Sequence, residues 1–201
     1  AIKSKLWADN RVDKVEEPVD AIVWLMKDPS LPPVVKINNP TLAAVMGATL
    51  ATKRTSAERL TSDVDKDALV IECYANPFRT YPLKDDYTKF KELFEKRNVD
   101  CFIFNTGHYL DKKVPKEVTL KALEDIVEGR AEFKAWGSLS NMEYLEIEGF
   151  PVNMEDKAYI EKLNNSIDYR IQFLESLKGK RDELPEETLD VLYKMKKEIC
   201  D

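Results

Sequence analysis

The chain has 201 residues, of which 31 are Lys or Arg and 37 are Asp or Glu, so its formal net charge is −6. A content of 43% hydrophobic and 34% charged residues is typical of a globular domain and excludes a disordered tail. The acidic balance argues against nucleic acid as a partner, because phosphate neutralisation needs clustered cations. A membrane is not expected either, since no apolar run approaches the roughly 18 residues that cross a bilayer.

Strand and helix patterns alternate over the first two thirds of the chain. The compact apolar run at 21–26 ends in turn residues, which predicts a strand buried on both faces. Asn39 is an N-cap residue followed by proline, so a helix should begin there, and Gly47 inside it indicates the close approach of another backbone. The polar stretch 51–67 is predicted to be a loop, and 68–74 a second strand.

A third strand leads into the most distinctive loop of the chain. Acidic residues at 85–86 open a helix that Asn98 closes, and the apolar run 99–104 then predicts a strand. The next helix should start at Pro115 and end at Gly129. Its inward-facing residues are predicted to be Leu120, Leu123, Ile126 and Val127.

Beyond Gly129 the pattern is irregular until two helices close the chain. A strand is predicted at 144–147, a long helix at 155–177 and a last helix from Leu184. The alternation predicts an α/β fold, with a mixed sheet flanked by helices and a C-terminal helical extension. The predicted parts are a leading segment, an α/β domain without a P-loop, and C-terminal helices packed on it (1–20, 21–154 and 155–201).

Residue types that carry catalysis are sparse. Neither GxxxxGK[ST] nor GxGxxG can be built from the six glycines, and the single histidine, His108, forms no evident Cys-His or Ser-His pair. Three isolated cysteines suit a reducing, cytoplasmic setting. Asp63, Asp65 and Asp67 lack the glycine and closing glutamate of a calcium loop. We therefore expect no catalytic residue and no bound metal in this chain.

The loop from 105 to 119 is the strongest candidate site. It follows a buried strand, so Asn105 should lie at the carboxyl end of the sheet, where open α/β sheets bind ligands. Lys112 and Lys113 precede a helix start, and the resulting cluster of ammonium groups and backbone donors suits a phosphate or a nucleotide. A solvated strand-to-helix connection explains the same residues equally well.

Two stretches resemble ATP-dependent phosphoenolpyruvate carboxykinases. The segment 31–37 is similar to the family's Leu-Pro-Pro-Val-Ser-Lys-Leu, and the Ala-Glu-Arg at 57–59 follows at a similar distance to the family's Thr-Glu-Arg. Asn105-Thr106-Gly107 is similar to the family's Asn-Thr-Gly after a strand. Lys112-Lys113-Val114 and Thr119 then take the places of the family's Lys-Arg-Ile and the threonine that follows it.

The resemblance implies an α/β nucleotide-binding domain with a site for the adenine of ATP. By this likeness Lys113 lies against the adenine, Val114 offers its backbone to the base, Thr119 adds a polar contact, and Asn105 to Gly107 support that loop. Lys113 in place of arginine and Val35 in place of serine mark the chain as a diverged relative. The implied nucleotide-binding residues are Asn105, Thr106, Gly107, Lys112, Lys113, Val114 and Thr119.

The family's P-loop, metal ligands and oxaloacetate-binding arginines lie upstream of the similar region. The resemblance therefore implies a longer parent protein whose missing N-terminal part is the partner of this C-terminal portion, and which converts ATP and oxaloacetate to phosphoenolpyruvate, CO2 and ADP with a divalent metal. The chain alone should be inactive and bind ATP no tighter than roughly millimolar. Two alternatives stay open: a non-catalytic nucleotide- or anion-binding regulatory module, and an interaction or structural domain that uses the helices at 155–178 and 185–200.

Overall fold

The computed structural model describes residues 16–53 and 68–200, and its centre is a five-stranded sheet with the order β1-β5-β2-β9-β8. β1 and β5 run parallel, whereas the other neighbouring pairs are antiparallel. The strands are Ala21–Met26 (β1), Val34–Ile37 (β2), Asp100–Asn105 (β5), Phe133–Ala135 (β8) and Met142–Leu145 (β9). The predicted α/β fold with a mixed sheet is therefore confirmed.

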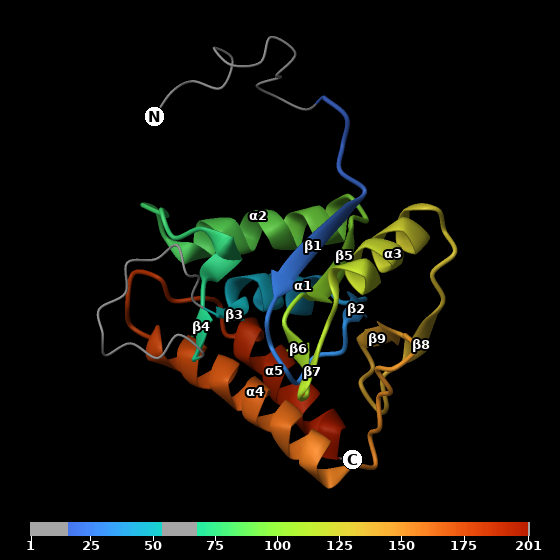
Figure 1. Ribbon diagram of the computed structural model, residues 1–201. Coiled ribbons are helices and arrows are strands. Elements are labelled where there is room, and N and C mark those ends of the chain that lie inside the picture. The colour runs from blue at the N-terminus through green and yellow to red at the C-terminus, as the bar shows by residue number, and fades with distance from the viewer. Residues whose placement is uncertain (1–15, 54–67, 201) are drawn as a thin grey trace, which may run out of the picture.

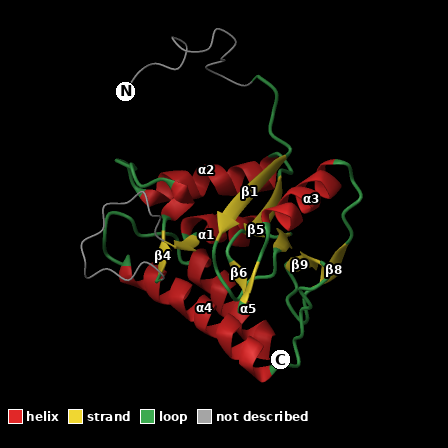
Figure 2. Cartoon of the chain, viewed as in Figure 1, coloured by secondary structure: helices red, strands yellow, loops and turns green. Residues whose placement is uncertain are grey.

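Five α-helices surround the sheet in the described part of the chain, and α4 and α5 run side by side below the other elements in Figure 1. They are Pro40–Ala48 (α1), Leu83–Lys96 (α2), Lys116–Val127 (α3), Lys157–Ser176 (α4) and Glu187–Cys200 (α5). Two small antiparallel pairs accompany them: Ala51–Lys53 (β3) with Leu69–Ile71 (β4), and His108–Tyr109 (β6) with Lys112–Lys113 (β7). Figure 2 shows the strands at the centre and the helices around them.

Side-chain caps start α1 and α4 close to where the sequence predicts these helices. Asn39 Oδ1 accepts the Leu42 N–H at 2.8 Å, and Pro40 is the first residue of α1. Asp156 caps α4 in the same way through the N–H of Ala158, at 2.9 Å. The helices predicted near 85, 115, 155 and 184 are also present, with starts shifted by at most three residues.

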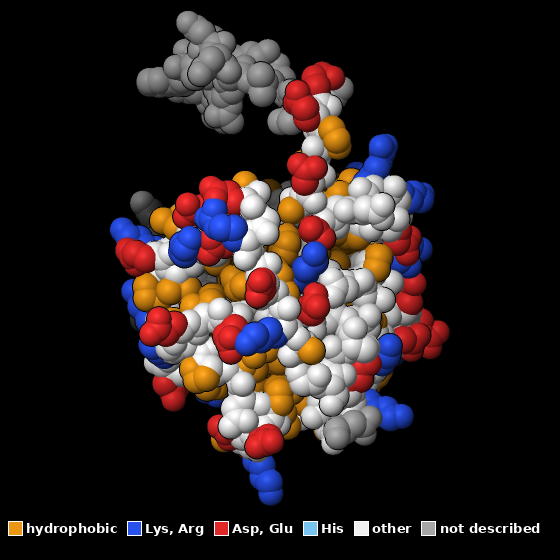
Figure 3. Space-filling view, turned by 90° about the vertical axis from the view of Figure 1, so that its right-hand side faces the viewer, with side chains coloured by type: hydrophobic (Ala, Val, Ile, Leu, Met, Phe, Trp, Pro, Cys, Tyr) orange, Lys and Arg blue, Asp and Glu red, His pale blue; other side chains and the backbone are white. Residues whose placement is uncertain are grey.

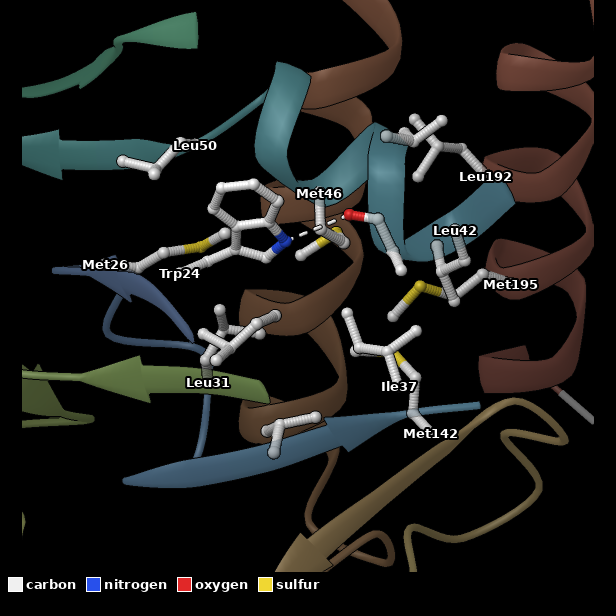
Figure 4. Packing of buried hydrophobic residues seen from close by; sticks show 14 of the residues in the cluster. Trp24, Met26, Leu31, Ile37, Leu42, Met46, Leu50, Met142, Leu192 and Met195 are labelled. Atoms are coloured by element: carbon white, nitrogen blue, oxygen red, sulfur yellow. Dashed lines mark hydrogen bonds between the residues drawn. The ribbon is translucent and has the colours of Figure 1, made fainter. Parts of the chain in front are cut away.

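One face of the sheet carries the main hydrophobic core, which α1, α2, α4 and α5 cover. Figure 4 shows Trp24 of β1, Met46 of α1, and Leu192 and Met195 of α5 in this core. Trp24 Nε1 donates to the Ala43 carbonyl at 3.0 Å, so the indole is buried with its donor satisfied. The C-terminal helices thus share one core with α1 and the sheet.

β1 is an edge strand, and this corrects the prediction that both of its faces are buried. It pairs only with β5, and Leu25 is 57% exposed although Trp24 beside it is buried. A short apolar run does not distinguish a central strand from an edge strand. The second strand also differs from the prediction, because residues 69–71 form β4, which pairs with β3 outside the five-stranded sheet.

Gly47 lies against side chains, whereas the sequence predicted another backbone. A Cβ at this position would lie 2.6 Å from Trp24 Cζ2 and 2.7 Å from Tyr74 Cε1. The predicted close approach is therefore present, but the neighbour was wrongly assigned. Aromatic rings from β1 and from the turn after β4 occupy the space that a larger residue would need.

α3 is rotated away from the predicted orientation. Its buried residue is Ala122, which packs on Phe102 and Phe104 of β5 in a small second core on the other face of the sheet. Three of the four residues predicted to face inward, Leu120, Leu123 and Val127, are 62%, 41% and 77% exposed, whereas Ile126 packs against the second core as predicted. Both sides of this helix carry apolar residues at helical spacing, so periodicity alone leaves its rotation undetermined.

Some predictions fall outside the described residues. The leading segment 1–20 is described only from residue 16, and the predicted loop 51–67 only at 51–53, which form β3. The Ala-Glu-Arg stretch at 57–59 and the aspartates at 63, 65 and 67 are not described. The region 130–154, predicted to hold one strand, contains both β8 and β9.

Candidate functional site

A buried amide organises the turn after β5. Asn105 is fully buried, and its Oδ1 accepts the Gly107 N–H at 3.1 Å. Its Nδ2 donates to three carbonyl oxygens, those of Asp28 at 2.9 Å, Leu31 at 2.7 Å and His108 at 2.8 Å. Both polar atoms of the side chain are thus used within the protein, and they hold the β1–β2 loop against the turn.

A short hairpin carries the chain from this turn to α3. The backbone N–H and the hydroxyl of Thr106 both donate to the Met26 carbonyl, at 2.9 and 3.2 Å. After the β6–β7 pair, the Val114 N–H donates to the Gly107 carbonyl at 2.9 Å and closes the hairpin. A Cβ on Gly107 would lie 3.1 Å from Lys27 Cα, so a residue without a side chain suits this close approach to the end of β1.

An open pocket of about 590 Å³ lies where the hairpin meets the first turn of α3. Its volume falls within the roughly 300–1,000 Å³ that is usual for small-molecule sites. Four of the seven predicted nucleotide-binding residues line it, namely Thr106, Lys113, Val114 and Thr119. The remaining lining residues are Pro115, Lys116, Glu117 and Leu120.

The pocket combines apolar walls with a positive rim. Val114 and Leu120 provide apolar surface, while Lys113 and Lys116 are exposed ammonium groups that outnumber the one carboxylate, Glu117. α3 has no side-chain cap, and the Val118 N–H donates to the Pro115 carbonyl at 3.2 Å, so the backbone N–H groups of Lys116 and Glu117 can bond a ligand. Such an arrangement can hold a flat apolar ring against the wall and an anionic group near the helix start.

Lys112 lies outside the pocket. Its Nζ donates to the Gly149 carbonyl at 2.8 Å and stands 4.5 Å from the centroid of the Phe150 ring. These contacts tie β7 to the loop that follows β9. Asn105 and Gly107 are likewise absent from the lining, so the structure places these three predicted residues in the support of the loop and the other four around the pocket.

A buried ion pair lies beneath the β1–β2 loop. Arg170 of α4 and Asp28 are 2.9 Å apart, with side chains 0% and 1% exposed. The hydroxyls of Ser30 and Ser166 donate to the same carboxylate at 2.7 and 2.6 Å. Burial raises the pKa of Asp28, but Arg170 and the two hydroxyls outweigh it and hold that pKa below its ordinary value of 3.8. Because the Asp28 carbonyl accepts from Asn105, this pair links α4 to the candidate site.

The described residues offer no grouping that holds a metal. Over 16–53 and 68–200, no three His, Cys, Asp or Glu side chains come together as ligands. The divalent metal implied by the resemblance therefore has no ligand set in this part of the chain. In the same described ranges, no helix is both long and apolar enough to span a bilayer.

The fold and the pocket together define an α/β domain with a candidate ligand site at the carboxyl end of a central strand. The chain is similar to the phosphoenolpyruvate carboxykinase (ATP) of Aeropyrum pernix, with 26% identity over 115 residues. This match covers 57% of the chain and 22% of the relative, so the chain spans a small fraction of the carboxykinase that it matches. No family model matches the chain. The relationship to the carboxykinases is therefore a distant one.

Sequence reasoning missed half of the pocket lining. Pro115, Lys116 and Glu117 lie within the candidate loop 105–119 but were not among the predicted binding residues, and Leu120 lies outside that loop. The signal was present, because a ligand at a helix start meets the residues of its first turn as well as the preceding loop. Leu120 was missed for another reason, since it was predicted to face inward.

Proposed function

We propose that this chain is the C-terminal part of a phosphoenolpyruvate carboxykinase-like protein and forms one wall of its pocket for the adenine of ATP. On this proposal the parent converts ATP and oxaloacetate to phosphoenolpyruvate, CO2 and ADP. One observation carries it: the residues that the resemblance assigns to the adenine, Lys113, Val114 and Thr119, line a single pocket of about 590 Å³. The distant likeness to a carboxykinase named for ATP supports the same function.

The lining residues have distinct roles in this proposal. The buried Val114 provides an apolar surface and a backbone that can bond the edge of the base. The apolar stem of Lys113 covers one face of the ring while its ammonium group faces the phosphates. The hydroxyl of Thr119 bonds a polar edge of the base. Because lysine stacks on a base less well than arginine, the pocket should bind adenine more weakly than an arginine-bearing one.

The proposed partner is the rest of the parent, and the exposed side of α3 is its docking surface. Leu120 belongs both to the pocket and to the exposed stripe of Leu120, Leu123 and Val127, and Leu25 is exposed on the edge strand β1. Figure 3, which views the side of the molecule where α3 lies, shows hydrophobic side chains exposed among charged ones. Covering this stripe would close the pocket from its open side and exclude water from the bound base.

An assay of the full-length parent tests the proposal. With ATP, a divalent metal ion and oxaloacetate, the parent should form phosphoenolpyruvate and ADP, whereas the isolated chain should form neither. Lys113→Glu in the parent should raise the KM for ATP about fivefold or more, because it places a negative charge beside the nucleotide. Lys84→Glu, which makes the same charge change on α2, should leave it unchanged.

Two results would contradict the proposal in different ways. Turnover by the isolated chain would show that the chain is not inactive alone. A parent that binds ATP but forms no phosphoenolpyruvate would favour the regulatory nucleotide-binding module.

A further inference from the structure

A second and separate groove lies on the other side of α3, between this helix and the β8–β9 pair. Its volume is about 600 Å³, similar to that of the pocket beside the hairpin, and Glu117 is the one residue that lines both. Its lining comes from α3 and from the segments 130–134 and 145–148. The proposed nucleotide function leaves it unused.

The floor of the groove is apolar. Val118 and Ala122 come from α3, and Leu145 and Ile147 come from the end of β9 and the residues after it. Ala122 is buried, whereas the other three are half-buried, so apolar surface faces the groove. A floor of this size can accept a small alkyl chain or an aromatic ring.

The cations on the rim are already paired within the protein. Lys121 and Arg130 both contact Asp125, at 2.8 and 2.9 Å, and Lys134 pairs with Glu146. Together Lys121 and Arg130 hold the pKa of Asp125 below its ordinary value, and Glu146 raises the pKa of Lys134. Arg130 also pairs with Glu128, and both Lys121 and Arg130 lie within 4 Å of Glu124. These three positive groups are therefore neutralised by neighbouring carboxylates and are poorly disposed to bind an anion.

Carboxylates are left over on the same rim. Five acidic and three basic residues line the groove, which gives it a net charge of −2. Among the described residues, neither Glu132 nor Glu148 has a basic partner within 4 Å. Glu132 lies close enough to Lys134 to raise its pKa, but Lys134 is bonded to Glu146. The groove thus offers an apolar floor together with two carboxylates that form no ion pair.

We propose that this groove binds a small amphipathic cation, in which an alkyl or aryl group carries an ammonium group. The apolar part lies on Val118, Leu145 and Ile147, and the ammonium group lies between Glu132 and Glu148. Charge complementarity selects this ligand class, since an anion would meet net negative charge and a purely apolar ligand would leave both carboxylates unmatched. The proposal does not rest on the nucleotide site.

Three probes with one apolar body test the head-group preference. Phenylbutylammonium, phenylbutanol and phenylbutyrate are titrated into the isotope-labelled chain, and backbone amide shifts are followed by NMR. The ammonium probe should saturate the amides of Val118, Ala122, Leu145 and Ile147, with an affinity about tenfold above that of the carboxylate probe. Equal affinity for the three probes, no saturable shift, or shifts confined to other residues would overturn the proposal.

A charge reversal provides the sharper arm of the test. The double variant Glu132→Lys/Glu148→Lys should invert the preference, so that phenylbutyrate binds better than phenylbutylammonium at the same amides. Both residues are exposed and form no ion pair within 4 Å, so the fold should tolerate the change. The control is Glu155→Lys/Glu161→Lys, which changes the net charge equally at exposed positions near and in α4 and should keep the original preference. An unchanged preference in the groove variant would contradict the assignment.

A second copy of the chain is the remaining occupant of the groove to test. Sedimentation of the unliganded chain across a concentration series should show a monomer. If a dimer does form, diluting it should leave the NMR shifts of the groove amides unchanged. If dilution does move these shifts, a second copy of the chain occupies the groove and the proposal is wrong.

Discussion

At the scale of single residues, the amide of Asn105 shows how a buried polar group can shape a site without contacting a ligand. Its Nδ2 supplies the carbonyls of Asp28, Leu31 and His108, and its Oδ1 accepts from Gly107. Asparagine suits this position because it carries both a donor and an acceptor group. The turn that precedes the pocket depends on this one side chain.

Asn105→Ala should therefore destabilise the chain by about 2–3 kcal/mol, because buried carbonyls lose their donor. The free energy of unfolding in urea measures the loss. The matched control is Asn38→Ala, which removes an exposed amide bonded only to Glu143 and should cost less than about 1 kcal/mol. Similar costs for the two variants would show that the turn is not held by Asn105.

The buried carboxylate of Asp28 predicts a pH dependence. Although burial raises its pKa, Arg170, Ser166 and Ser30 hold the folded value below 3.8, the value expected for the unfolded chain. Its contribution to stability is then complete above about pH 4 and is lost as the pH falls through the lower folded pKa. Urea unfolding between pH 5 and 2 should show a smaller loss of stability on acidification in Asp28→Asn than in the wild type.

A carboxylate without this environment provides the control. The side chain of Asp111 is fully exposed, so Asp111→Asn should keep the acid dependence of the wild type. An Asp28→Asn variant whose acid loss matches that of the wild type would contradict the role given to the ion pair.

At the scale of elements, Gly47→Ala in α1 should destabilise the chain, although alanine favours helices. Alanine gains about 1 kcal/mol over glycine inside a helix. In α1, however, the added Cβ would lie 2.6 Å from Trp24, whose indole is bonded to Ala43 and cannot move freely. Overpacking of about 1–3 kcal/mol should outweigh the propensity. Thermal unfolding should therefore show a lower Tm for Gly47→Ala, and a higher Tm would contradict this packing.

The exposed stripe of α3 should tolerate polar substitutions, although the sequence pattern predicts that its residues are buried. The triple variant Leu120→Gln/Leu123→Gln/Val127→Gln should change the unfolding free energy of the isolated chain by less than about 1 kcal/mol. Leu163→Gln in α4, at a fully buried position, should cost about 3 kcal/mol or more. A large loss in the triple variant would show that the stripe is buried in the chain itself.

These elements also show what could be predicted from the sequence. N-cap residues and long apolar stripes located α1, α2, α4 and α5 to within three residues, because those signals are local. The rotation of α3, the edge position of β1 and the separate β3–β4 pair depend on contacts between distant segments. β8 is three residues long and too short to leave a periodic pattern.

At the scale of the whole molecule, the C-terminal helices are part of the structure that supports the site. Leu163 of α4 and Leu192 of α5 are fully buried in the main core, and Arg170 reaches Asp28 beneath the loop. An apolar stripe predicted that these helices pack on the domain, but the ion pair could not be predicted. Its partners lie 142 residues apart, and no local pattern joins them.

The candidate site was predicted in part for similar reasons. Thr106, Lys113, Val114 and Thr119 were found because they follow a strand in one continuous stretch that resembles a known motif. Lys112 belongs to the same stretch, but its contacts with Gly149 and Phe150 come from a distant loop. The groove between α3 and β8–β9 could not be predicted from the sequence, because β8 was not predicted and the inward face of α3 was predicted wrongly.

An NMR titration of the isotope-labelled chain with ATP tests most directly whether this pocket binds adenine. We expect saturable shifts centred on the amides of Thr106, Lys113, Val114 and Thr119, with a dissociation constant on the order of 1 mM or weaker because the pocket is open on one side. Lys113→Glu should abolish these shifts. Shifts centred elsewhere, or no saturable shift at these amides, would contradict the assignment of the pocket to adenine, and micromolar binding would contradict the view that it is only one wall.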